Sequence, residues 1–213
     1  MDSRWVVLIL GVMILAVLYQ DQISAFGSRK LVNSSVDGKP YRIVSTFEGG
    51  NDAADMLANI NTFLLQVLKY MKVKYVDNPS PKTARHRAYT QRLLDLYNPD
   101  VLRENNPRST VNTSYVTNKG DEIYFCLREK KTGKANFHDL EVLKFVALHE
   151  ISHIATTGYG HDDEFWSNFK FIAREAAEAG LYKPVDYRQH PADYCALTID
   201  YSPLYDARLP YPF

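Results

Sequence analysis

The stretch His149-Glu150-Ile151-Ser152-His153, followed by Gly158-Tyr159-Gly160-His161, is the most informative part of this chain. Residues four apart lie on one face of an α-helix, so His149 and His153 can present both imidazoles to one metal ion. Glu150 lies one position along and can reach a water molecule at that ion. The glycines allow the chain to turn back, so we expect His161 to be the third ligand. This H-E-x-x-H spacing predicts a zinc (Zn2+) site with His149, His153 and His161 as ligands and Glu150 as the catalytic acid/base.

The residues that flank the motif predict a buried helix. Phe145-Val146-Ala147-Leu148 precede it and Ile154-Ala155 follow it, and Glu150 is the only charged residue between Lys144 and Asp162. A helix that is apolar nearly all round is a buried helix. Buried polar groups without partners are costly, and a metal with its water would satisfy the glutamate and both histidines. A core helix with two hydrogen-bonded histidines is the alternative interpretation.

The ends of this helix and of the next one can be predicted from capping residues. Asn136 is the expected N-cap of the first helix, which should run to Thr156 or Thr157 before the glycines. The acidic residues of 161–164 then suit the positive end of a second helix, which should end at Gly180.

The segment Gly160-His161-Asp162-Asp163-Glu164-Phe165-Trp166 resembles the third-ligand region of WLM-type and SprT-like metallopeptidases. In those proteins a histidine follows the H-E-x-x-H helix after a short turn, and an aromatic residue follows a few positions later. The resemblance covers about residues 140–179, a fifth of the chain. It implies an α+β, zincin-like metallopeptidase domain with an active-site helix and a small antiparallel sheet.

The sequence departs from two other zincin patterns. Metzincins place a glycine and a histidine where this chain has Thr156 and Tyr159. A gluzincin takes a glutamate from the following helix, and here Glu175 and Glu178 are the alternative third ligands.

A site with three protein ligands leaves a position for water and is typical of catalysis. Zinc lowers the pKa of such a water toward roughly 7, and Glu150 can take its proton and pass it to the leaving amine. We therefore expect an enzyme, a hydrolase of peptide bonds that acts through a zinc-activated water, with a protein or peptide as substrate. An additional donor for the oxyanion is expected among Tyr159, Tyr182, Tyr187, Tyr194 and Arg188.

Two other functions are compatible with the motif. The chain can be a non-catalytic interaction protein on a zincin scaffold, or a zinc hydrolase of a non-peptide amide. A hairpin is predicted just upstream, with residues 114–117 and 122–128 around a glycine-containing turn. Peptide substrates of zincins commonly pair with the edge of such a sheet, and a purely structural hairpin is the alternative interpretation.

Composition places the chain among globular proteins. It has 213 residues, of which 46% are hydrophobic and 23% charged, which fits one domain with additional elements. Lys+Arg and Asp+Glu both number 25, so the net charge is zero, and there is no long basic block. We therefore expect no nucleic-acid partner.

Only two cysteines, Cys126 and Cys195, are present. They can form one bridge in an oxidising compartment or remain buried thiols. The cluster His190-Pro191-Ala192-Asp193-Tyr194-Cys195 contains ligand-type residues but is interpreted as a local loop.

The N-terminal residues 5–19 (WVVLILGVMILAVLY) carry no charge. They can form a signal anchor, a cleaved signal peptide or, less readily, a core helix. The expected division is residues 1–25 as a transmembrane anchor or signal segment, 26–40 as a linker and 41–213 as the zincin-like domain. The expected location is a membrane, crossed once through the N-terminal hydrophobic helix. The catalytic domain would lie on the exocytoplasmic or luminal side, or be secreted if the segment is cleaved.

The remaining expectations concern secondary structure: a strand over 41–46, helices over 52–75 and 84–97, a loop over 98–113 and an extended chain after Gly180.

Overall fold

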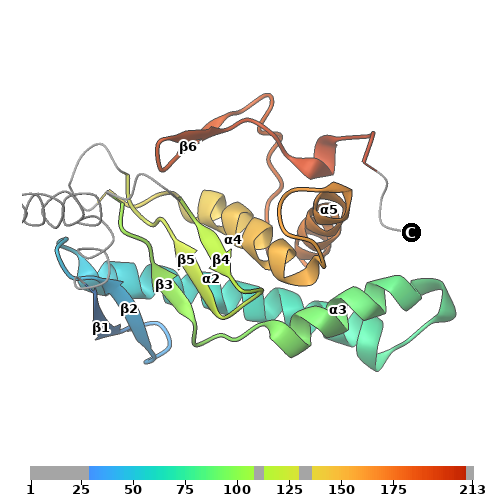
Figure 1. The fold of residues 1–213 in the computed structure, drawn as a ribbon, viewed down its shortest axis with the longest axis horizontal. Helices are drawn as coiled ribbons and strands as arrows, with labels where there is room; N and C mark the ends of the chain where they lie inside the picture. Colours follow the sequence, from blue (N-terminus) through green and yellow to red (C-terminus); the bar gives the residue numbers. More distant parts are fainter. Residues whose placement is uncertain (1–28, 108–112, 130–135, 210–213) are drawn as a thin grey trace, which may run out of the picture.

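The computed structural model describes residues 29–107, 113–129 and 136–209. The described chain is an α+β domain in which four helices pack against and beside a small sheet (Figure 1). The strands are β1 (Arg29–Asn33), β2 (Pro40–Val44), β3 (Leu102–Glu104), β4 (Tyr115–Thr117), β5 (Glu122–Phe125), β6 (Ala192–Tyr194) and β7 (Leu197–Ile199). The α-helices are α2 (Gly50–Met71), α3 (Ala84–Leu96), α4 (Leu140–Ala155) and α5 (Asp163–Glu178).

The main sheet is mixed, whereas we expected an antiparallel one. Its order is β1-β2-β3-β5-β4; β1 pairs with β2 and β4 with β5 antiparallel, but β3 is parallel to both β2 and β5. The helices α2 and α3 lie between β2 and β3 in the chain, and such a long connection allows parallel pairing. The sequence did not reveal β3, because three residues, Leu-Arg-Glu, are too few to show alternation; this stretch was expected to be loop.

The expected linker also contributes to the sheet. Its residues Arg29–Asn33 form β1 and pair with β2 along all five positions of the strand. Gly38, with φ +73°, makes the turn between the two strands. The segment 26–40 is therefore an edge hairpin from residue 29 onward, and its polar composition reflects a strand with exposed side chains.

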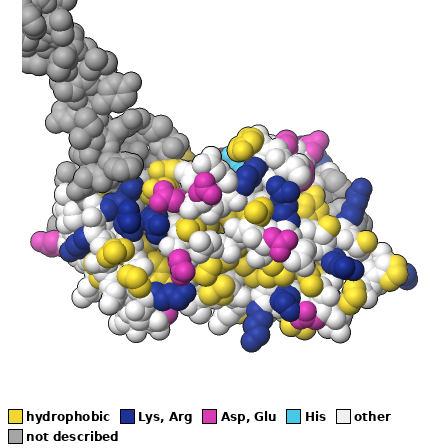
Figure 2. Space-filling model, turned by 60° about the horizontal axis from the view of Figure 1, so that its bottom comes forward, with side chains coloured by type: hydrophobic (Ala, Val, Ile, Leu, Met, Phe, Trp, Pro, Cys, Tyr) yellow, Lys and Arg dark blue, Asp and Glu magenta, His cyan; other side chains and the backbone are white. Residues whose placement is uncertain are grey.

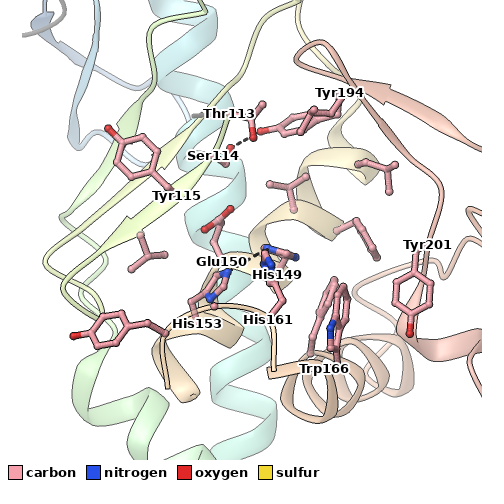
Figure 3. A pocket seen from close by; sticks show the side chains of 18 of the residues that line it. Thr113, Ser114, Tyr115, His149, Glu150, His153, His161, Trp166, Tyr194 and Tyr201 are labelled. Carbon is pink, nitrogen blue, oxygen red and sulfur yellow. Dashed lines mark hydrogen bonds between the residues drawn. The ribbon is translucent and has the colours of Figure 1, made fainter. Parts of the chain in front are cut away.

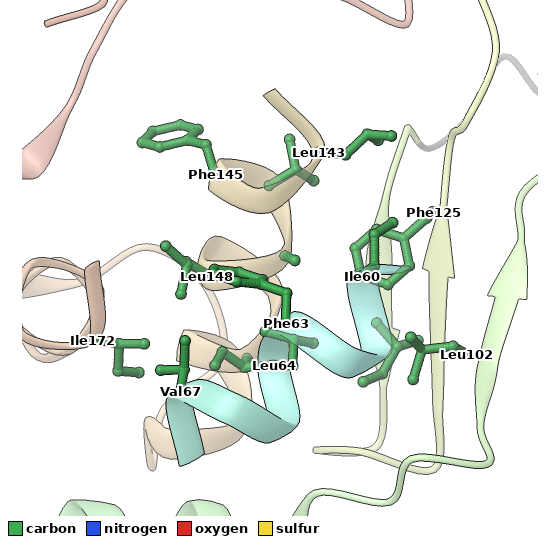
Figure 4. Packing of buried hydrophobic residues seen from close by; sticks show 14 of the residues in the cluster. Ile60, Phe63, Leu64, Val67, Leu102, Phe125, Leu143, Phe145, Leu148 and Ile172 are labelled. Carbon is green, nitrogen blue, oxygen red and sulfur yellow. The ribbon is translucent and has the colours of Figure 1, made fainter. Parts of the chain in front are cut away.

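The helices predicted over 52–75 and 84–97 are confirmed as α2 and α3, and a π-helical turn extends α2 to Asp77. The buried face of α2 packs against the sheet and against α4 (Figure 4). Its side chains Ile60, Phe63, Leu64 and Val67 are buried beside Leu148 of α4. Burial of one such apolar side chain stabilises the fold by about 1.5–3 kcal/mol, so this interface holds α4 firmly in place.

The helix that carries the H-E-x-x-H motif is buried on nearly all sides, as its flanks predicted. It contacts α2, α3, α5 and β4. Its expected start was wrong: Asp139, not Asn136, is the N-cap and accepts a hydrogen bond from the Glu141 N–H at 2.7 Å. Asn136 instead accepts a backbone hydrogen bond from Glu129, in a segment that pairs with residues 127–129 after β5.

The expectation of a single-pass membrane protein is corrected by the structure. Within residues 29–107, 113–129 and 136–209, no helix has both the length and the apolar character that a membrane crossing requires. Residues 5–19, on which the anchor and signal-segment predictions rest, lie outside the described part of the chain. The membrane location is therefore not retained.

Candidate metal centre

Three imidazoles converge at the C-terminal half of α4 (Figure 3). His149 and His153 lie one helical turn apart, with their Nε2 atoms 3.3 Å from each other. His161, in the loop after the helix, brings its Nε2 to 3.0 Å from that of His149. The structure therefore assembles the three predicted ligand residues.

The spacing of the three histidines fits a tetrahedral metal. Zinc–nitrogen bonds of 2.0–2.1 Å at tetrahedral angles place two ligand nitrogens about 3.3 Å apart. The His149–His153 separation has this value and the His149–His161 separation is slightly shorter. Three neutral imidazoles form a donor set that zinc prefers, and three protein ligands leave room for water.

The surroundings keep these histidines neutral. Burial, followed by the neighbouring histidines, lowers the pKa of His149 to about 3. Burial, with His161 and Lys119 as further causes, lowers the pKa of His153 to about 4, and burial also lowers the pKa of His161. At neutral pH each ring therefore keeps a lone pair for a metal.

Phe165 of α5 holds the three rings in place. Its ring stacks on His153 at 4.3 Å between centroids and meets His149 and His161 edge-on at 4.9 and 4.5 Å. Phe165 is fully buried, so it acts as a fixed apolar support behind the metal ligands. Such outer contacts orient ligands.

The loop that carries His161 is fixed at both ends. At its start, the Asn168 amide donates to the hydroxyl of Thr156 at 3.0 Å. Both the backbone N–H and the hydroxyl of Thr157 donate to the carboxylate of Glu164. At its end, Asp162 caps α5 by accepting from the Phe165 N–H at 2.9 Å. The loop is therefore a defined structure, not a loose connection.

Two cations approach the carbonyl end of α4. Lys119, in the turn between β4 and β5, donates to the carbonyl of His153 at 3.0 Å and also to that of Gly158. Arg92 of α3 donates to the carbonyl of Ile154 at 3.3 Å. Positive charge at a helix C-terminus is stabilising. Of the two cations, only Lys119 joins the helix to the turn before His161. No sequence pattern predicted this contact.

Glu150 lies beside the histidines with its carboxyl group directed toward Ser114 and Tyr194 (Figure 3). It is only 3% exposed, and within the described residues its Oε2 atom has no hydrogen-bond partner. Burial raises the pKa of Glu150 to about 8. A buried carboxyl group with a free oxygen and a pKa near neutrality is suited to exchange protons.

A cavity of about 540 Å³ opens over the histidines and Glu150. One side is formed by β4 and the turn after it, another by α4 and α5, and a third by the β6–β7 hairpin and Tyr201. The sequence did not predict this third side, because β6 and β7 have only three residues each and were expected to be loop and extended chain.

The alternative third ligands lie elsewhere. Glu175 is buried and accepts hydrogen bonds from Lys74 and Tyr75, each at 2.8 Å, and Glu178 also binds Lys74. Neither glutamate lines the cavity.

Only two of the five candidate oxyanion donors, Tyr159 and Tyr194, line the cavity. The hydroxyl of Tyr194 is 2.5 Å from that of Ser114, and Tyr159 is 83% exposed beside Lys119. Tyr187 instead packs against Phe145.

A second cluster, Cys126, His138 and Cys195, also contains ligand-type atoms. The two cysteines are joined by a disulfide, which resolves the alternatives left by the sequence. Their sulfurs are therefore not available to a metal in this structure. The bridge connects the turn of the β6–β7 hairpin to the residue after β5.

Comparisons with known proteins identify relatives of this chain. A WLM domain model matches residues 98–190, which include all four predicted site residues. The uncharacterized protein R325 of Acanthamoeba polyphaga mimivirus is 31% identical over 169 residues, 79% of this chain and 81% of that protein. The uncharacterized protein 136R of Invertebrate iridescent virus 6 is 41% identical over 69 residues, 32% of this chain and 38% of that protein. No solved structure matches the chain significantly.

Proposed function

Because the chain belongs to the family of the mimivirus protein R325 and carries a WLM domain, we propose that it is a zinc-dependent metallopeptidase. His149, His153 and His161 would hold the metal through their Nε2 atoms, and Glu150 would be the catalytic acid/base. The observation that carries the proposal is the meeting of three neutral imidazoles beside a buried carboxyl group in an open cavity.

In the proposed reaction, the metal and Glu150 have different roles. Zinc, when bound, supplies a Lewis acid that makes water acidic near neutral pH. Glu150 accepts the proton of the attacking water at its free Oε2 atom and then delivers it to the departing amine. The raised pKa of Glu150 belongs to the metal-free chain, and a zinc ion bound beside it would lower that pKa and favour the carboxylate that accepts the proton.

The sheet offers a place for a peptide substrate. β4 is the edge strand of the main sheet, and its residues Tyr115 and Val116 line the cavity. An extended peptide can pair with such an edge through backbone hydrogen bonds. This arrangement would carry the peptide past the histidines and favours a polypeptide over a small amide as substrate.

Cleavage of an unstructured protein substrate such as casein by the zinc-loaded chain tests the proposal. Glu150→Gln should keep one zinc per chain and lower the cleavage rate by at least about 10²-fold, because the proton acceptor is removed. Glu141→Gln, on the exposed start of the same helix, is the matched control and should cleave like the wild type.

The outcomes separate the alternatives. Zinc binding without cleavage of any protein or peptide would favour an interaction protein or a hydrolase of another amide. Equal cleavage by Glu150→Gln and the wild type would remove Glu150 from the catalytic role.

A further inference from the structure

The β6–β7 hairpin forms the wall of the cavity that faces α4 and α5 (Figures 1 and 3). Tyr194, Leu197 and Ile199 line the cavity, whereas Asp193 and Thr198 do not. The strand register explains this alternation, because Tyr194 pairs with Leu197 and Asp193 with Thr198. Successive residues of a strand point to opposite faces, so one face of the hairpin belongs to the cavity.

The hairpin is held rigidly in this position. The disulfide attaches Cys195, in its turn, to Cys126. The hydroxyl of Tyr194 is bonded to that of Ser114, which also accepts from the Cys126 N–H at 3.0 Å. The turn residues Cys195 and Ala196 have φ of 48° and 66°, a conformation that L-residues other than glycine adopt only at a cost. Such a conformation persists because the surrounding contacts enforce it.

The wall is apolar where it meets the opposite side. Leu197 and Ile199 line the cavity together with Trp166 and Phe169 of α5 and Phe145 of α4. Leu197 remains 57% exposed, so a large apolar side chain is left uncovered at the rim. A ligand that covers it would remove apolar surface from water, which favours binding.

Apart from the proposed zinc ion, the charged side chains of the cavity disfavour an acidic side chain. Its lining residues with formal charge are Lys119, Glu150 and Asp200. The amine of Lys119 is already engaged by the carbonyls of His153 and Gly158. Among the described lining residues, no other lysine or arginine is present to pair with a carboxylate, and Asp200 would repel one.

We infer that the β6–β7 hairpin selects polypeptide substrates that place a large aliphatic or aromatic side chain next to the scissile bond, against Leu197 and Ile199. The inference rests on the proposed peptidase function for the position of the scissile bond. A cavity of about 540 Å³ lies within the roughly 300–1,000 Å³ typical of ligand pockets and accommodates such a side chain with its backbone.

A binding experiment tests this selection independently of catalysis. The probes are two fluorescent Ala/Gly/Ser peptides that differ only in one central residue, Phe or Asp. Their affinities are measured by fluorescence anisotropy on the zinc-loaded full chain carrying Glu150→Gln, which prevents cleavage. The Phe peptide should bind at least about 10-fold more tightly, as expected for filling an apolar pocket.

Two added variants make the test specific to the hairpin. Leu197→Lys places a cation on the cavity face and should reverse the preference, so that the Asp peptide gains affinity. Thr198→Lys places the same charge on the opposite face of the same strand and should keep the preference for Phe. A misfolded variant would lose affinity for both peptides, so a gain of affinity for the Asp peptide cannot result from misfolding.

Each outcome decides one of the two proposals. Equal affinities for both peptides, no binding of either peptide, or the same effect of both lysine variants would overturn the selection by the hairpin. Selective binding by the Glu150→Gln protein together with no cleavage by the wild type would overturn the peptidase function and leave the hairpin as a recognition surface.

Discussion

Glu150 differs from the other buried acidic residues that the structure describes, Glu104, Glu175 and Asp206, which form ion pairs. Its carboxyl group lies in an apolar part of α4 with one oxygen unbonded. The protonated form is favoured in the folded chain, as its raised pKa of about 8 indicates. Such an arrangement weakens a fold and is retained where a function needs it. The structural cost of Glu150 can be measured.

Glu150→Gln should stabilise the metal-free protein at high pH. The carboxyl pKa is about 8 in the folded chain against 4.5 in the unfolded chain, so ionisation favours unfolding as pH rises between these values. The variant should be more stable than the wild type by on the order of 2–4 kcal/mol near pH 8 and nearly equal to it near pH 5. Chemical denaturation after treatment with a chelator measures this difference. A difference in the free energy of unfolding that stays constant across this pH range would contradict the raised pKa of Glu150.

Lys119 is expected to raise the zinc affinity by fixing the backbone that carries the ligands His153 and His161. Because its amine holds the carbonyls of His153 and Gly158, Lys119→Met should loosen the turn before His161 and weaken zinc affinity by about 10–100-fold. Competition with a zinc-binding dye measures the affinity.

Arg92→Met is the matched control for Lys119→Met, because Arg92 binds the same helix end but does not contact the His161 turn. It should alter stability and leave zinc affinity within a few-fold of the wild type. Equal losses of zinc affinity in both variants would show that the cations act on the end of α4 and not through the turn before His161. Lys119→Arg should bind zinc more tightly than Lys119→Met, because it keeps a donor at this position.

At the scale of elements, the disulfide and the short strands position the wall of the cavity. Replacement of Cys126 and Cys195 by serine should lower the free energy of unfolding by about 2–4 kcal/mol, because the bridge closes a loop of 69 residues. Denaturation with and without a reducing agent measures this, and the reducing agent should affect only the wild type. Equal stability of both proteins would mean that the bridge does not form in solution.

The sequence predicted the helices of the site and the β4–β5 hairpin, but not the strands β3, β6 and β7. The apolar patterns of α4 and α5 are long enough to be recognised, although the N-cap of α4 is Asp139 and not the expected Asn136. Both glycines after the motif mark the turn. β3, β6 and β7 have three residues each, so their pairing depends on distant partners and leaves no periodic signal. The cavity wall could not be predicted for this reason.

At the scale of the whole molecule, the site combines segments far apart in the chain. Residues of 113–119 form one side, residues of 145–169 carry the histidines, Glu150 and the aromatic support, and residues of 194–201 form the wall. The spacing of the motif predicted the central segment, and the predicted hairpin over 114–117 and 122–128 is confirmed as β4 and β5. The third segment is attached to the site by the disulfide, which no local pattern encodes.

The distribution of charge agrees with the zero net charge of the sequence. On the face shown in Figure 2, lysine and arginine side chains are interspersed with acidic and hydrophobic ones. That the protein has no nucleic-acid partner was predicted from its composition and stays a prediction.

The central claim is that three histidines of this chain bind one zinc ion, and metal content after purification and dialysis against zinc tests it most directly. Elemental analysis should find one zinc per wild-type chain and much less in His161→Ala. His190→Ala, which removes an exposed histidine outside the cavity, should retain the wild-type content. No zinc in folded wild-type protein, or equal zinc in both variants, would contradict the three-histidine site and with it the proposed peptidase.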